Sequence, residues 1–362
     1  MADMKLISVL VAVVIVGSIA GAALMINSGA DDGGDPPEAE YPSSVTITQN
    51  DGRKVTVATP VERICVVNPN AAELMQVLNV TDRVVGVSES IAKDTEFGYI
   101  YDDVPTIGTY STPNGEKMLD LGCKVVIGQC TSMAIKDTTV LEDMGITVVL
   151  LDCYGIGQLT DDLRQLATLF GYDAQAKAEE YIKIYNETMA AVGQASAALG
   201  SSVTAYMELS NGKAYTSKSE MSSLIELAGG YNIVIDLVKN PTSSTGQISN
   251  EAIIAYDGGK GPEYVFVREG RIVDDAAAEQ KYQSLASREG WSDMEAVKND
   301  NVYIITQAGM LSGPRIYIGL VYLFEVFHPG VLDMSSAELL EEYNHAFGYD
   351  IDPMLGYRHV SA

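Results

Sequence analysis

The feature that most constrains the fold is an unbroken helical stretch at residues 174–198. It contains no proline, and its apolar residues recur at helical spacing, so we expect one helix of about 40 Å. On both sides of it, short β-branched runs alternate with helical segments. This alternation is typical of βαβ units with parallel strands. The sequence therefore predicts two α/β lobes with mainly parallel sheets. The single rigid helix that joins them allows only limited rocking of the lobes.

The expected elements follow from these runs. Alternation around the Asp51-Gly52 pair predicts a hairpin at 45–57. Strands are expected at 64–67, 84–87, 125–127, 147–151, 203–207, 264–267 and 302–305. Helices are expected at 71–78, 135–144, 158–170, 219–228, 250–256, 276–286, 316–327 and 336–347. The predicted parts are a signal or membrane anchor (1–26), an acidic Gly/Pro linker (27–44), an N-terminal lobe (45–173), a connecting helix (174–199), a C-terminal lobe (200–350) and a tail (351–362).

The N-terminus predicts the compartment. Leu6 to Ile26 is an uncharged apolar run, and as a helix it would span about 30 Å of hydrocarbon. Lys5 precedes this run and acidic residues follow it, which places the remainder of the chain outside the cell. A retained anchor at the outer face of the membrane and a signal peptide cleaved before secretion both fit. No cysteine directly follows the run, so a bacterial-type lipid anchor is not supported.

The charge balance excludes one class of partner. The chain has 49 acidic and 23 basic side chains, a formal net charge of −26. Such a surface repels phosphate backbones and anionic headgroups, so we expect no nucleic acid partner. The acidity can equally serve solubility alone.

Two glutamates occupy similar places in the two halves. Glu73 stands in a short helical opening at 68–74, and Glu226 stands in a second one at 224–232. For Glu73 there is a local alternative, because Asn70 and Glu73 fit a capping box at a helix start. The corresponding alternative for Glu226 is an ordinary exposed acid.

Several motifs together resemble a known family. In order they are DGRKV (51–55), PVERI (60–64), NPNAAEL (68–74), DRVVGV (82–87), GTY (108–110), ELAGGYN (226–232) and GPR (313–315). The chain resembles the class III substrate-binding proteins of ABC importers, which handle ferric siderophores, haem and cobalamin. The resemblance implies two lobes joined by one rigid helix, with the ligand in the cleft between them. It also implies that Glu73 and Glu226 dock on arginines of a permease dimer that works with ATPase subunits.

The candidate ligand contacts lie at the carboxyl ends of the expected strands, where loops surround the crevice of an open α/β sheet. In the N-terminal lobe this rule selects Asn70, Tyr110, Cys130 and Tyr154, and in the C-terminal lobe Tyr215 and Arg315 are the comparable candidates. Tyrosine offers a flat apolar face with a hydroxyl, and arginine can hold an anionic oxygen with two donors. For any single tyrosine, in a chain with 20 of them, ordinary packing is the alternative.

The remaining chemistry argues against an enzyme. The chain has no Walker loop, no complete dinucleotide fingerprint and no Gly-x-Ser-x-Gly elbow in its exported part. The cysteines Cys65, Cys123, Cys130 and Cys153 and the three histidines lack zinc-like spacing. We expect buried thiols, with a Cys130 to Cys153 disulfide left open. No metal site and no intrinsic cofactor are expected.

The resulting expectation is a solute-binding protein, outside the cytoplasm, that captures an iron complex and delivers it to an ABC permease. By resemblance, the bound ligand is a ferric chelate, haem or cobalamin. A corrinoid-binding protein of the same class is one alternative. A membrane-tethered surface module is another, and it predicts no role for Glu73 and Glu226. A chelatase-like enzyme would require a basic residue, usually histidine, in the cleft, and the sequence places none there.

Overall fold

The N-terminal part of the fold begins with the expected hairpin. The computed structural model describes residues 40–131, 134–270, 274–306, 313–351 and 356–359. Strands β1 (Ser44–Thr48) and β2 (Lys54–Ala58) pair antiparallel, with Ser44 opposite Ala58. Gly52 in the connecting turn has a φ of 83°, a conformation that glycine adopts without steric cost. Residues Tyr41–Ala362 form one compact unit.

A parallel four-stranded sheet follows the hairpin, in the order β4-β3-β5-β6. Its strands are β3 (Ile64–Val66), β4 (Val84–Val87), β5 (Val125–Gly128) and β6 (Thr147–Leu150), close to the expected runs. The helical elements between and after them are α1 (Pro69–Val77), η1 (Thr81–Arg83), α2 (Glu89–Ala92), η2 (Gly98–Tyr101), α3 (Gly115–Asp120), α4 (Thr138–Asp143) and α5 (Leu159–Ala167). β3 and β5 are buried throughout, as expected for strands covered on both faces.

The long helix is confirmed as α6 (Tyr172–Ala197), 26 residues that begin two positions before the expected start. Its buried side recurs at helical spacing and includes Ala178, Tyr181, Tyr185 and Val192. At about 1.5 Å per residue the helix is about 39 Å long.

A seven-stranded sheet forms the C-terminal lobe. Its order is β10-β8-β7-β11-β12-β13, and β9 also pairs with β7. The central strands β7 (Val203–Leu209), β11 (Tyr264–Glu269) and β12 (Val302–Thr306) are parallel. The short strands β8 (Lys213–Tyr215), β9 (Gly230–Asn232), β10 (Thr245–Gln247) and β13 (Gly356–Arg358) were not expected from the sequence. With three residues each, they offer too little length for a periodic signal.

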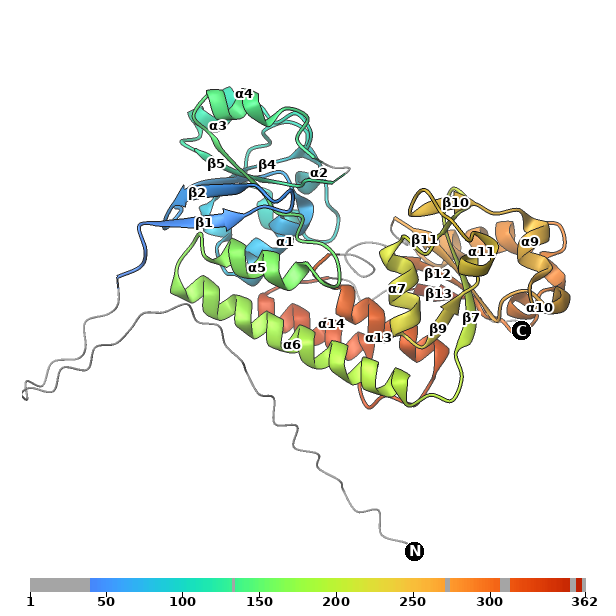
Figure 1. Ribbon diagram of the computed structural model, residues 1–362. Coiled ribbons are helices and arrows are strands. Elements are labelled where there is room, and N and C mark those ends of the chain that lie inside the picture. Colours follow the sequence, from blue (N-terminus) through green and yellow to red (C-terminus); the bar gives the residue numbers. More distant parts are fainter. Residues whose placement is uncertain (1–39, 132–133, 271–273, 307–312, 352–355, 360–362) are drawn as a thin grey trace, which may run out of the picture. The chain divides into compact units, whose positions relative to one another are not determined.

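The helices of this half are α7 (Glu220–Leu227), α8 (Val234–Leu237), α9 (Asn250–Ile254), α10 (Tyr256–Gly259), α11 (Asp275–Ala286), η3 (Trp291–Asp293), α12 (Glu295–Lys298), α13 (Ile316–Phe327) and α14 (Ser336–Phe347). α13 packs on both α6 and α14, and the three run alongside one another in Figure 1. The rings of Tyr181 and Phe347 join α6 to α14, with centroids 5.9 Å apart.

The end of the chain also returns to the N-terminal lobe. Gln76 Nε2 donates to the carbonyl oxygen of Phe347 at 2.9 Å, and the amide of Asp350 donates to the Tyr99 hydroxyl at 2.9 Å. Side-chain contacts therefore link the two halves in addition to α6. The predicted lobe boundaries at 173, 200 and 350 stay a prediction.

Candidate functional site

The loop after β6 contains an unusual backbone conformation that neighbouring side chains stabilise. Cys153 has a φ of 50°, in the left-handed region that side chains rarely adopt. Its amide donates to Oδ2 of Asp162 at 2.9 Å, and Asn50 Nδ2 and Gln158 Nε2 donate to Oδ1 at 2.8 and 2.9 Å. Burial raises the pKa of Asp162, while these three hydrogen bonds act to lower it. A fully buried carboxylate with three donors thus fixes the backbone that leads to Tyr154.

Two asparagines extend this support to the other strand ends. The amide of Asp152 donates to Asn50 Oδ1, and Asn68 Nδ2 donates to the carbonyl oxygen of Leu151 at 2.7 Å. Asn68 Oδ1 in turn accepts from Gln129 Nε2 at 2.9 Å. The segments that follow β3, β5 and β6 are therefore bonded to one another, at the carboxyl edge of the sheet where open α/β folds place their ligands.

Two of the four expected N-terminal contacts bond directly to Asp152. Asn70 Nδ2 donates to its carbonyl oxygen at 3.3 Å, and the amide of Cys130 donates to its Oδ1 at 2.7 Å. Tyr154 follows two residues later and is 39% exposed. Tyr110 is half-buried and packs on the separate apolar cluster that contains Val126. Asn70 and Cys130 thus meet at Asp152, and Cys130 also packs on the cluster that Tyr110 contacts.

The facing residues come from the C-terminal sheet. Tyr215 ends β8, and its hydroxyl accepts a hydrogen bond from Arg268 Nη1, near the end of β11. The Arg268 guanidinium also lies 5.7 Å from the centre of the Tyr215 ring. Arg268 stands near the carboxyl end of the parallel strand β11, whereas Tyr215 lies on β8, which runs antiparallel to β7.

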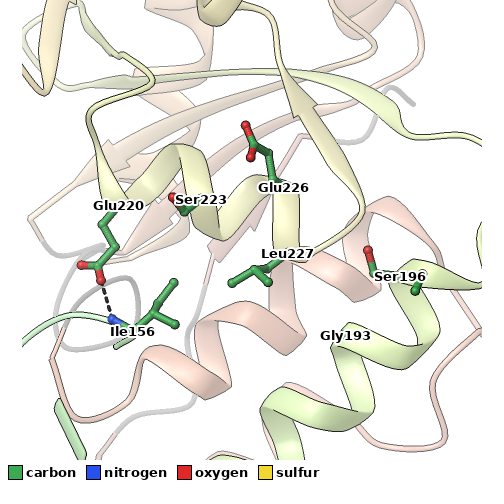
Figure 2. A pocket seen from close by; sticks show the side chains of 8 residues that line it. Ile156, Gly193, Ser196, Glu220, Ser223, Glu226 and Leu227 are labelled. Atoms are coloured by element: carbon green, nitrogen blue, oxygen red, sulfur yellow. Dashed lines mark hydrogen bonds between the residues drawn. The ribbon is translucent and has the colours of Figure 1, made fainter. Parts of the chain in front are cut away.

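Glu220, at the start of α7, connects the C-terminal half of the chain to the loop after β6. Its Oε1 accepts a hydrogen bond from the amide of Ile156, as the dashed line in Figure 2 shows. Burial raises the pKa of the Tyr154 phenol, the Glu220 carboxylate raises it further, and Arg268 opposes the rise. Tyr154, Tyr215, Glu220 and Arg268 therefore act on one another electrostatically and form the candidate site.

Arg315 does not take part in this site, which corrects the expectation from the sequence. Its side chain is 2% exposed; Nε lies 2.8 Å from Glu73 Oε1 and Nη2 lies 2.6 Å from Glu96 Oε2. Burial alone would lower the pKa of Arg315, but the two carboxylates raise it. The guanidinium is thus committed to an internal ion pair, and Arg268 is the arginine of the candidate site.

The docking role expected for Glu73 is also corrected, because its carboxylate belongs to the same ion pair. The Glu73 side chain is 2% exposed, and its Oε1 also accepts from the Tyr343 hydroxyl at 2.9 Å. A carboxylate without exposed surface cannot pair with arginines of another protein in this conformation. The capping-box alternative is also wrong, because Asn68 is the N-cap of α1 and accepts from the amide of Asn70 at 2.9 Å. Asn-Pro at 68–69 is the sequence signal for that start.

Glu226 is exposed on α7, as its docking role requires. It borders a pocket of about 720 Å³ lined by Ile156, Gly193, Ser196, Ala197, Glu220, Ser223, Glu226 and Leu227, most of which Figure 2 labels. The pocket adjoins the candidate site through Glu220 and Ile156.

Two residues of the site, Glu220 and Arg268, are not among those expected from the sequence. Arg268 directly follows the run 264–267, so the rule that selects residues at carboxyl ends of strands would have included it. Glu220 carries no comparable signal, because its partner Ile156 lies 64 positions away in the chain.

All four cysteines are free thiols, so the Cys130 to Cys153 disulfide left open above is not formed. Within the described ranges, no group of three or more His, Cys, Asp or Glu side chains could hold a metal ion. In the same part of the chain no helix has the length and apolarity to span a membrane. The anchor expected at 6–26 lies outside the described residues.

Comparisons with known proteins give a consistent result. Residues 64–308 match the family described as "Periplasmic binding protein". A Bacillus subtilis protein named as an uncharacterized ABC transporter substrate-binding lipoprotein is 23% identical over 79% of this chain and 86% of its own length. A Halobacterium salinarum protein named "Cobalamin-binding protein" is 27% identical over 61% of this chain and 59% of its own. The crystal structure of a TroA-like periplasmic binding protein from Veillonella parvula has the same fold, with a TM-score of 0.71 and 18% identity, covering 87% of this chain and all of that one.

Proposed function

Since this chain belongs to the periplasmic binding proteins, the substrate-binding components of ABC transporters, we propose that it captures a metal complex and delivers it to an importer permease. The family consists of transport proteins that work outside the cytoplasm and not of enzymes. The proposed cargo is an iron complex of siderophore or tetrapyrrole type, and a corrinoid is the alternative.

One observation carries this proposal. The candidate site brings Tyr154, from the segment after β6, together with Tyr215, Glu220 and Arg268 from the C-terminal half of the chain. Tyrosine faces suit a large flat or macrocyclic ligand, and Arg268 can hold one of its oxygens. The name of the Halobacterium relative supports the corrinoid alternative.

Binding can be tested by thermal unfolding of the full chain with ferric siderophores, haem, cobalamin and molybdate, each in excess. A ligand at about 100 times its Kd adds about 2.7 kcal/mol to the free energy of unfolding, a shift of several degrees. A shift with one compound, reduced in the Arg268→Ala variant, supports the site. The absence of any shift would contradict the proposed cargo classes.

Delivery requires a docking surface, for which we retain Glu226. Exposed carboxylates that meet arginines steer association and fix orientation more than they supply affinity. Glu226→Ala should leave ligand binding unchanged and lower the stimulation of the permease ATPase. Glu289, also exposed and in the C-terminal half, gives the matched control. Equal stimulation by the Glu226→Ala and Glu289→Ala proteins would refute the docking role.

We also propose that residues 6–26 keep the protein at the outer face of the membrane. A tether raises the effective concentration of the binding protein at its permease. If the segment is retained, the native protein should partition with membranes and should not be released by high salt; recovery of a shorter soluble form would show cleavage.

A further inference from the structure

The loop at 154–157 is bonded to the C-terminal half of the chain and to the long helix. The amide of Ile156 donates to Oε1 of Glu220, at the start of α7, and the carbonyl oxygen of Ile156 accepts from the Tyr185 hydroxyl of α6 at 2.7 Å. The phenol of Tyr154 is also hydrogen-bonded to the Glu220 side chain. Glu220 thus holds two neighbouring positions of the loop, and α6 supplies a third bond.

Glycine at position 155 makes this close approach possible. Gly155 has a φ of 95°, and a Cβ there would lie 3.0 Å from Glu220 Oε1, nearer than ordinary van der Waals contact. Gly157 differs, because among the described residues no neighbouring atom lies within 4 Å of the position of its Cβ. The loop is therefore shaped to admit the Glu220 carboxylate at residue 155 and not at residue 157.

A charged donor of the same site is closed off from solvent. Arg268 Nε is buried and has no hydrogen-bond partner among the described residues, while Nη1 of the same side chain donates to the Tyr215 hydroxyl. Tyr154 lies near both charges, since Arg268 and Glu220 act on its phenol. A buried cationic donor without an acceptor is unfavourable. A ligand oxygen could supply that acceptor only after neighbouring side chains move.

We propose that Glu220 is a latch that keeps the candidate site closed in the free protein, and that the site opens when the loop at 154–157 separates from α7. This inference deepens the proposed function, because it concerns access to the same site. Opening frees Tyr154 and uncovers Arg268 Nε. A ligand oxygen that bonds to this donor offsets the lost latch bonds, so ligand binding shifts the population toward the open state.

Open space beside the latch allows it to move. Ile156 and Glu220, which the latch joins, both line the pocket of about 720 Å³, and Figure 2 shows the bond between them. Other parts of this lining are small, at Gly193, Ser196 and Ala197 of α6. The Glu220 side chain can therefore leave the loop without displacing packed groups.

Labelling of arginine in the full chain, without ligand, tests the latch. Phenylglyoxal modifies accessible guanidinium groups, so it should label Arg268 slowly in the wild type. In Glu220→Ala the labelling should be about ten times faster or more, the factor that corresponds to one hydrogen bond to a charged group. Arg53, whose side chain is 51% exposed, gives the reference rate in the same sample. Glu289→Ala, an exposed control, should leave the labelling of Arg268 unchanged.

A second pair of variants perturbs the latch from the loop and leaves Glu220 in place. Gly155→Ala puts a methyl group against Glu220 Oε1, so it should accelerate both the labelling of Arg268 and the hydrogen exchange of the Ile156 amide. Gly157→Ala adds the same group where space is open, so it should change neither rate. This pair decides the question if the Glu220→Ala protein does not fold.

Three outcomes overturn the inference. Labelling of Arg268 that is as fast as that of Arg53 in the wild type would show that the site is already open. Slow labelling in both Glu220→Ala and Gly155→Ala would show that the contact does not control access. A latch that opens in use cannot be required for the fold, so failure of both variants to fold also refutes it. None of these measurements needs a ligand, so their failure is separate from that of the proposed function, which the thermal shifts test.

Discussion

Replacing Glu73 by glutamine separates a structural role from a docking role. Glu73 Oε1 accepts from Arg315 Nε at 2.8 Å and from the Tyr343 hydroxyl at 2.9 Å, with both charged side chains 2% exposed. Removing one partner of a buried ion pair costs about 3–5 kcal/mol, because the other charge stays buried. Glu96 remains 2.6 Å from Arg315, and glutamine keeps an acceptor oxygen, so we expect a loss of about 3 kcal/mol.

This loss can be read from thermal unfolding of the full chain. For a protein of this length the entropy of unfolding is about 0.7 kcal/mol/K, so 3 kcal/mol lowers the melting temperature by about 4 °C. Glu226→Gln is the control, because an exposed substitution changes the free energy of unfolding by less than about 0.5 kcal/mol.

The result that would refute this reasoning is also specific. If Glu73→Gln melts with the wild type and loses only permease stimulation, the buried pair with Arg315 does not form and the docking role holds. If it melts early but binds ligand at low temperature, Glu73 is structural.

Three further substitutions test other parts of the structure. Asp162→Ala should lose about 1–3 kcal/mol in denaturant unfolding, because the amide of Cys153 loses its acceptor, and a loss below 0.5 kcal/mol would refute its supporting role. Gly86→Ala should lose about 1–3 kcal/mol, since a Cβ there would lie 2.7 Å from Ile107 Cγ2; an unchanged unfolding midpoint would contradict this packing. The hydrogen bonds of Glu279, first from Tyr357, lower its pKa to about 2, so the stability it contributes is present above its ordinary pKa and lost as pH falls toward 2. Glu279→Gln should weaken the pH dependence of the hydrogen-exchange protection of β13 over that range. An unaltered pH dependence would exclude the contact between Glu279 and Tyr357.

The secondary structure was largely accessible from the sequence because its signals are local. The hairpin follows from alternation around an Asp-Gly turn, and α13 and α14 have the bounds that their apolar periodicity predicts. The strands β8, β9 and β10, which the sequence did not predict, have three residues each, and their pairing depends on neighbours in the sheet.

The candidate site was only partly accessible. Placement at a strand end identified Tyr154, because the carboxyl edge of a parallel sheet is fixed by strand order. Tyr215 was a candidate although its strand, β8, was not expected. Arg315 also follows from a motif, yet its side chain turns inward to Glu73, which is 242 positions away. Only the tertiary structure brings Arg315, at the start of α13, beside Glu73 of α1.

By itself, the sequence determined the class of this protein: two α/β halves around one long helix, with the motif order of a substrate-binding protein. Apolar periodicity and turn residues act over a few positions, so they can be recognised in the sequence alone. The tertiary structure alone decided which charges are free. Whether a carboxylate is buried with an arginine, as Glu73 is, or exposed, as Glu226 is, depends on residues brought together from distant parts of the chain.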